Sequence, residues 1–142
     1  ARQLANMVIL YSPLQMAADL IENYRGVPAF EFIRNLKVDF DESYVEHAKI
    51  GEYITVVRRA GHDWFIGGAT DRNARTLDLN LDFLAPDKAY EAVVFRDADD
   101  ANWESNPEAY VIDSLKVNSK SSLQLKMAAG GGIAIHIKPL NK

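Results

Sequence analysis

Alternation of apolar and polar residues, from about residue 44 to the end of the chain, is the feature that most constrains the fold. Leu77, Leu79 and Leu81 alternate with polar residues, and the same pattern recurs over 122–128 and 133–138. A period of two places the apolar side chains on one face of a β-strand and the polar ones on the other. Strands with one buried and one solvated face are typical of antiparallel sheets.

Eight strands are expected in this part of the chain, with turn signals such as Gly61-His62 and Ala85-Pro86-Asp87 between them. Because no helical spacing separates the strands, a two-sheet sandwich is the favoured architecture. The predicted fold class is therefore mainly β: an antiparallel β-sandwich of about eight strands, preceded by an N-terminal helical segment. The expected strands are Tyr44–Lys49, Glu52–Ala60, Asp63–Thr70, Arg75–Phe83, Ala89–Asp97, Tyr110–Val117, Ser122–Ala128 and Ile133–Lys138.

The beginning of the chain has helical spacing instead. Leu4, Met7, Val8 and Tyr11 fall on one face of a helix, whereas Ile9 lies nearly opposite. A helix on the surface of a small domain needs one apolar stripe, and this helix has almost two. We therefore expect its second side to be exposed here or covered by something else.

Two further helices are expected before the strands begin. Ser12 followed by proline is typical of an N-cap and a first helical residue, and predicts a second helix that runs to Leu20. Pro28 predicts the start of a short third helix. The chain is thus divided into a helical segment at 1–36 and a β-sandwich domain at 37–142.

The composition is that of an ordinary globular chain of 142 residues, with 48% apolar and 25% charged residues. Its 16 basic and 20 acidic residues give a net charge of −4, which argues against nucleic acid or an anionic membrane as a partner. No apolar run approaches the roughly 20 residues that cross a bilayer. The absence of Cys removes disulfides and thiolate chemistry. The chain opens on Ala1 rather than Met, so we expect it to be part of a longer protein.

No catalytic constellation is predicted, and no residue is assigned a catalytic or metal-binding role. His47, His62 and His136 lie far apart and lack the spacing of zinc ligands. His136 is expected on the solvated face of the last strand. Acid–base hydrolysis of a glycoside needs two carboxylates across a cleft, and acids such as Glu52 have no partner that the sequence identifies.

An acidic stretch beginning at residue 97 resembles a calcium-binding loop in part. Asp97, Asp99 and Glu108 fall at positions 1, 3 and 12 of such a loop. However, Asn102 stands where a glycine is needed, and Ala101 offers no side-chain oxygen. A solvated loop is the favoured interpretation.

The two tryptophans and the paired glycines complete the candidates. Trp64 is expected in the core, whereas Trp103 is either a buried anchor of its loop or an exposed platform on which a sugar ring stacks. Gly67-Gly68 predicts a bulge or a close approach of another backbone. The run Gly130–Gly132 predicts a hairpin turn or bulge, because neither a helix nor a Lys-Ser/Thr pair follows it as in a phosphate-binding loop.

Several motifs occur in a characteristic order along the chain. The run Tyr11–Asp19, followed by Glu22-Asn23-Tyr24, resembles the stretch that closes the catalytic barrel of glycoside hydrolase family 97. Further motifs resemble the family's C-terminal sandwich, namely Ile50–Arg59, Asp63–Asp71, Tyr90-Glu91-Ala92 with Phe95-Arg96-Asp97, Trp103-x-x-Asn106-Pro107-x-Ala109-Tyr110 and Gly130–Gly132. The resemblance covers essentially the whole chain.

The resemblance implies an α-glycosidase parent, acting on α-glucosides or α-galactosides and exported to the periplasm of Gram-negative bacteria. It implies an N-terminal β-rich domain, a (β/α)8 barrel and a C-terminal β-sandwich. The family's catalytic carboxylates and calcium ligands lie upstream of this sandwich. No catalytic residue, metal ligand or cofactor is therefore carried over to this chain, and calcium is implied only for the parent.

The leading hypothesis is a non-catalytic C-terminal β-sandwich that packs against the catalytic barrel of its parent and stabilises it. The alternative is a carbohydrate-binding module that holds an α-linked oligosaccharide through exposed aromatics such as Trp103. A third interpretation is an interaction domain unrelated to sugar. Self-association through the N-terminal helix is also expected if Ile9 and Leu10 are exposed.

Overall fold

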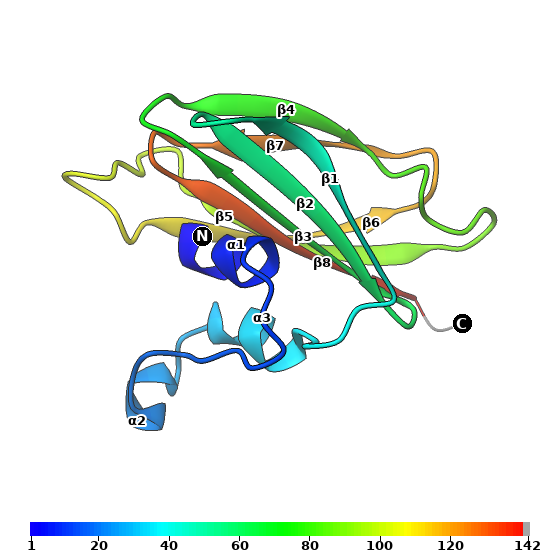
Figure 1. Ribbon diagram of the computed structural model, residues 1–142, viewed down its shortest axis with the longest axis horizontal. Helices are drawn as coiled ribbons and strands as arrows, with labels where there is room; N and C mark the ends of the chain where they lie inside the picture. Colours follow the sequence, from blue (N-terminus) through cyan, green and yellow to red (C-terminus); the bar gives the residue numbers. More distant parts are fainter. Residues whose placement is uncertain (141–142) are drawn as a thin grey trace.

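The computed structural model describes residues 1–140, which form two stacked antiparallel sheets with helices on one outer side (Figure 1). The smaller sheet pairs β4 (Arg75–Asn80) with β7 (Ser122–Met127). The strands of the larger sheet are, in spatial order, β1 (Glu42–Lys49), β2 (Tyr53–Ala60), β3 (Asp63–Thr70), β8 (Gly132–Pro139), β5 (Tyr90–Asp97) and β6 (Tyr110–Val117). The predicted eight-stranded antiparallel sandwich is confirmed.

The core between the two sheets is built by the alternating apolar residues. Leu79 and Leu125 face inward from the small sheet, and Val57, Ile66 and Ile135 face them from the large one. Each is fully buried, as a period of two requires for the covered face. The fourth strand ends at Asn80 rather than Phe83, because the chain turns there and Leu84 N–H donates to the carbonyl of Leu81. The full cluster also contains Trp64, Leu81, Leu84, Tyr90, Ala92, Val94, Val117, Met127, Ile133 and Ile137.

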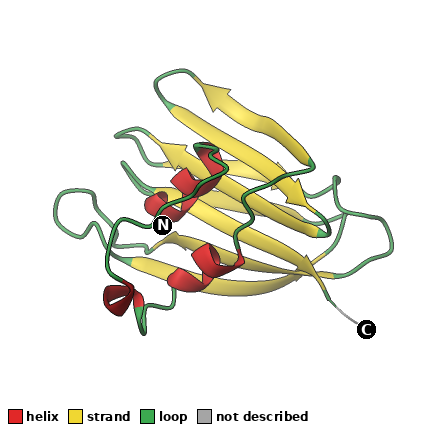
Figure 2. Cartoon of the chain, turned by 60° about the horizontal axis from the view of Figure 1, so that its bottom comes forward, coloured by secondary structure: helices red, strands yellow, loops and turns green. Residues whose placement is uncertain are grey.

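A helical layer covers the opposite face of the larger sheet (Figure 2). It consists of α1 (Arg2–Ile9) and α3 (Phe30–Asn35), while α2 (Ile21–Tyr24) projects away from the sheet (Figure 1). Their apolar residues form a second cluster, made of Leu4, Val8, Phe32, Phe65, Phe95 and Ala134. The central strands β3 and β8 are therefore buried on both faces.

The second predicted helix is wrong. Residues 11–20 are irregular, and only Ile21–Tyr24 form a short helix. Leu14 and Met16, which should have formed its apolar face, are 74% and 75% exposed. A short helix depends on packing of such a face, and these side chains have nothing to pack against. Instead, the side-chain amide of Gln15 donates to the carbonyl of Met7 at 3.1 Å and ties the segment to α1.

The first and third helices lie where the sequence predicts them. Along α1, Leu4 and Val8 are buried against the sheet, as their spacing predicts. Ile9 is half-buried rather than exposed, whereas Leu10 is exposed as expected. Across residues 1–140, no helix is both long enough and apolar enough to cross a membrane.

Candidate functional site

Five chain segments meet at one end of the sandwich, which we call the loop end. They are the β1–β2 turn, the β3–β4 connection, the β5–β6 loop, the β7–β8 turn and the start of α1. Backbone hydrogen bonds join them: Gly130 N–H donates to the carbonyl of Asp71, and Asp71 N–H donates to that of Glu52. The Arg2 guanidinium adds side-chain bonds to the carbonyls of Thr70 and Gly130, at 2.7 and 2.8 Å. The sequence gives no signal for these contacts, because their partners lie far apart along the chain.

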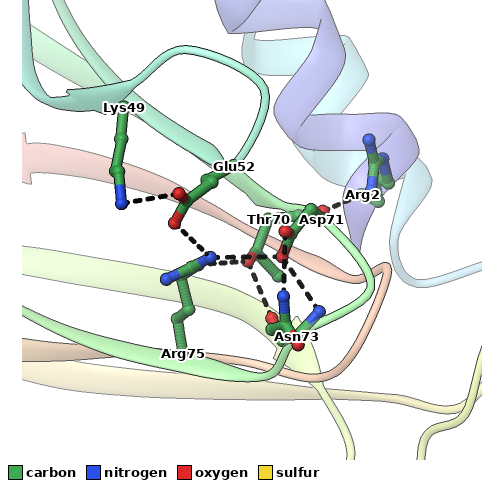
Figure 3. A network of polar contacts seen from close by, with 7 residues as sticks. All are labelled: Arg2, Lys49, Glu52, Thr70, Asp71, Asn73 and Arg75. Carbon is green, nitrogen blue, oxygen red and sulfur yellow. Dashed lines mark hydrogen bonds and ion pairs between the residues drawn. The ribbon is translucent and has the colours of Figure 1, made fainter.

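A charge network fixes one side of the loop end (Figure 3). Arg75 donates to Glu52 at 2.9 Å and to Asp71 at 3.3 Å, and Lys49 donates to Glu52 at 2.6 Å. The hydrogen bond from Lys49 lowers the pKa of Glu52 below its ordinary value, and the backbone N–H of Asn73 does the same for Asp71. Both carboxylates are thus held in the charged, paired state. This arrangement suits a structural brace and does not suit a general acid.

Trp103 projects from the β5–β6 loop at the other side of the loop end. Its side chain is 62% exposed, so the buried-anchor interpretation is wrong and the exposed alternative describes its position. Asn102 and Asn106 hold the loop through a pair of backbone hydrogen bonds of 3.1 and 2.9 Å. Beside the indole lies a cleft of about 220 Å³, lined in part by Arg2, Pro107 and Gly130. A ring-shaped ligand could stack on this indole.

Asp97, whose side chain is mostly covered, anchors the base of that loop. Its Oδ2 accepts hydrogen bonds from the backbone N–H of Ala128 at 3.0 Å and of Gly132 at 2.8 Å. A Cβ on Gly131 would overlap this carboxylate, which explains a glycine there. The turn expected at Gly130–Gly132 is present, with Gly130 at φ +69°, but it does not close a hairpin, because β7 and β8 belong to different sheets and do not pair.

The rest of the acidic stretch is an exposed loop. Asp99 pairs with Arg96 at 3.6 Å, and the Asp100 carboxylate accepts a hydrogen bond from the Asn106 amide at 3.1 Å. Within residues 1–140, no group of three or more His, Asp or Glu side chains is arranged to hold a metal ion.

The histidines and Trp64 lie elsewhere. Trp64 is buried in the core between the sheets, as predicted. The prediction for His136 is wrong: it is only 5% exposed, because the helical layer covers that face of β8. Its ring stacks on Phe65 at 4.6 Å, and Nε2 donates to Asp63 at 3.0 Å. Burial lowers the pKa of His136, and the neighbouring Asp63 offsets only part of that effect. His47 and His62 lie on β1 and in the β2–β3 turn.

A second candidate surface lies on the helical side. Residues 10–27 carry seven exposed large apolar side chains, and we call this stretch the apolar segment. Beside it, Tyr24 stacks on Phe30 at 4.6 Å over a hollow of about 440 Å³ that Arg34 borders. The sequence indicated an apolar excess here but placed it on regular helices. The exposed residues are Leu10, Tyr11, Leu14, Met16, Leu20, Ile21 and Val27.

The fold defines this chain as a β-sandwich domain with a helical layer on one face, from which the apolar segment is exposed. The family profile described as "Glycosyl-hydrolase 97 C-terminal, oligomerisation" matches residues 39–138. The chain belongs to this family of C-terminal domains of glycoside hydrolase family 97. The resemblance noted in the sequence is thereby confirmed.

Longer relatives contain the same domain. A retaining alpha-galactosidase of Bacteroides thetaiotaomicron is 38% identical over 138 residues, which is 96% of this chain and 20% of that protein. A family 97 enzyme of Pseudoalteromonas sp. strain K8, solved with acarbose, is 40% identical with a TM-score of 0.95 over 99% of this chain and 22% of its own. A beta-arabinopyranosidase structure is 26% identical, with a TM-score of 0.75, over 94% of this chain and 20% of its own. The chain thus spans about a fifth of these relatives.

Proposed function

We propose that this C-terminal domain packs against the catalytic barrel of an α-glycosidase through the apolar segment and stabilises that barrel. The single observation that carries the proposal is the seven exposed apolar side chains within residues 10–27. Apolar surface of this extent is uncommon on an isolated soluble domain and marks a contact. Burying one Leu or Met side chain is worth roughly 1.5–3 kcal/mol, so a few such residues hold two domains together.

The way α1 is attached supports this role. Arg58 Nε donates to the Val8 carbonyl at 2.7 Å, and its guanidinium lies 5.2 Å from the Tyr11 ring centroid. These contacts fix the start of the apolar segment on the large sheet. The beginning of the apolar segment is therefore fixed in position on the sheet, which suits a segment that joins two domains.

The activity of the whole protein is part of the same proposal. The parent would hydrolyse α-glucosidic or α-galactosidic bonds, with calcium bound in its upstream domains and with a periplasmic location. Support comes from the family membership and from the retaining alpha-galactosidase that shares this domain. The sandwich itself would contribute contact surface.

A double substitution in the apolar segment tests the packing role. In the full-length protein, L14D with M16D is expected to lower the melting temperature of the catalytic domain by several degrees, because two charges replace buried apolar contacts. In the 142-residue chain alone, the same pair should leave the melting temperature nearly unchanged, since both side chains are exposed there. Scanning calorimetry measures both values.

The matched control is I50D, because Ile50 is a fully exposed apolar residue at the β1–β2 turn, outside the apolar segment. It should leave the full-length melting temperature unchanged. An L14D/M16D protein that melts together with the wild type would refute the packing role.

A second candidate function is favoured by the exposure of Trp103 beside its cleft. In this role the loop end binds an α-linked oligosaccharide by stacking a sugar ring on the indole. Titration with malto-oligosaccharides should then change tryptophan fluorescence in a saturable way, and W103A should abolish the change. Trp64 serves as the internal reference, since it stays buried in the core. A flat titration of the wild-type chain would eliminate this function.

Oligomerisation is the remaining part of the proposed function, and the family description names it. Self-association through the N-terminal helix, which the sequence predicts, has little exposed apolar surface available on α1. Leu4 and Val8 of α1 are buried against the large sheet, and Ile9 is half-buried, so that Leu10 is the exposed residue of the pair Ile9 and Leu10. Another surface is better suited to a second copy.

A further inference from the structure

The outer edge of β6 is the best-formed open strand edge of the larger sheet. All eight residues from Tyr110 to Val117 pair with β5 in unbroken register, and no strand within residues 1–140 lies on the other side. Unpaired N–H and C=O groups along such an edge are a template for another strand. We propose that β6 pairs antiparallel with β6 of a second copy, which joins the two large sheets; this rests on the oligomerisation in the proposed function.

The other open edges are less suitable. The register of β1 shifts between Val45 and His47, and such a bulge protects an edge strand from pairing. Both strands of the small sheet are six residues long, and β4 turns the exposed Asp78 outward. The β6 edge is as long as β1 but more regular, and it is longer than either strand of the small sheet.

The one carboxylate of β6, and the neighbouring Glu91 on β5, are already paired within the chain. Asp113 accepts a hydrogen bond from Arg96 Nε at 2.8 Å, and Ser114 donates to Glu91 at 2.8 Å. Lys138 in turn pairs with Glu91 at 3.1 Å. A second strand would therefore approach without leaving a carboxylate of this edge unpaired.

Apolar side chains remain open on both faces of β6. Ile112 lies opposite Phe95 on the helical side, and Leu115 lies opposite Ala92 on the side of the small sheet. Both are more than a third exposed, because neither outer layer extends over the edge strand. Pairing with a second copy would cover part of each.

The strand itself selects one register. In a continuous sheet, directly opposite residues share a face, and the two registers with the longest overlap place either Asp113 or Ser114 opposite its own copy. Two carboxylates facing each other repel, which makes the first register less stable than the second. The second aligns residues 111–117 of both copies, with Ile112 opposite Lys116 and Asp113 opposite Leu115.

This arrangement is compatible with the packing role. A two-fold axis perpendicular to the sheet keeps the helical layers of both copies on the same side. The apolar segment of each copy lies on the helical side of the large sheet, whereas the new pairing would use backbone groups in the plane of the sheet (Figure 1). Each copy could therefore still meet its own catalytic domain.

A disulfide trap tests the register, because the chain has no Cys of its own. Facing residues in an antiparallel pair have Cα atoms about 4.5–5.5 Å apart, within the range of about 4.4–6.8 Å that a disulfide spans. The S114C chain should therefore form a covalent dimer under mild oxidation, seen on a non-reducing gel. The matched control S43C, at an exposed position on β1, should remain monomeric on that gel.

A charge substitution tests the surface itself. By sedimentation equilibrium, I112K should weaken the wild-type dimer about tenfold or more, because the new lysine would face Lys116 of the second copy. The control V45K, on the opposite edge, should retain the dimer. Circular dichroism confirms that the variants stay folded.

The outcomes separate two kinds of failure. A wild-type chain that stays monomeric at high micromolar concentration would overturn self-association by this domain. A wild-type dimer that resists I112K, fails to crosslink through S114C or dissociates with V45K would overturn only the β6 edge. Packing against the catalytic domain is tested independently by L14D/M16D.

Discussion

Gly67 is the residue at which the helical layer comes closest to the large sheet. A Cβ at this position would lie 2.6 Å from the carbonyl oxygen of Ala5 and 2.8 Å from the Cβ of Val8. The β2–β3 register is unbroken here, so of the two interpretations of Gly67-Gly68 the close backbone approach is correct and the bulge is wrong. A single missing methyl group thus sets the distance between α1 and β3.

G67A should therefore destabilise the chain by about 1–3 kcal/mol, the usual cost of overpacking, because the added methyl meets helix backbone and must displace α1. Urea unfolding followed by fluorescence measures the change. G68A is the matched comparison and should cost less, since its nearest neighbour is a methyl of Ile133 at 3.0 Å, on a side chain that can shift. Equal stability of G67A and wild type would show that α1 is not held by this contact.

At the level of elements, the strands were far more predictable than the helices. Alternation reports burial directly, and all eight strands lie where it placed them, apart from a few terminal residues. Helical spacing over 12–20 was misleading because Leu14, Met16 and Leu20 face outward from an irregular segment. Their apolar character reflects a surface to be covered, which local spacing cannot distinguish from a helix face.

Burial of a strand's second face could not be predicted either. Alternation in β8 assigned His136 to solvent, but α1 and α3 lie over that face. The contacts at the loop end could not be predicted from the sequence either, because Arg2 and Arg75 bind residues that only the fold brings close to them. Trp103 was recognised as a candidate, and only the structure decided that its side chain is exposed.

The two outer sides of the molecule differ in how much apolar surface they leave exposed. The small sheet closes the core on its side, whereas the helical layer covers the middle of the large sheet and leaves the apolar segment uncovered (Figure 2). His136 lies between the large sheet and this helical layer, stacked on Phe65. The interface between sheet and helical layer therefore holds a titratable group whose neutral form is favoured by burial.

The stability of the whole chain should fall as the pH drops below about 6.5, the ordinary value for His. Burial lowers the pKa of His136, while Asp63 counters this in part and Lys138 and Lys37 add to it. Below pH 6.5 the histidine therefore binds a proton in the unfolded chain, whereas in the folded chain it stays neutral until the pH reaches its lower pKa. Acid therefore favours the unfolded state. Each pKa unit of lowering costs about 1.4 kcal/mol at acidic pH.

Urea unfolding at pH 7.5 and 5.5 measures this loss, in a window above the ordinary values of 4.5 and 3.8 for Glu52 and Asp71, whose pKa values are lowered further. H136Q keeps a side-chain amide that can donate to Asp63 but removes the titration. Its free energy of unfolding should depend much less on pH across this window, even if it is lower throughout. The same pH dependence in H136Q as in wild type would assign the acid sensitivity to another group.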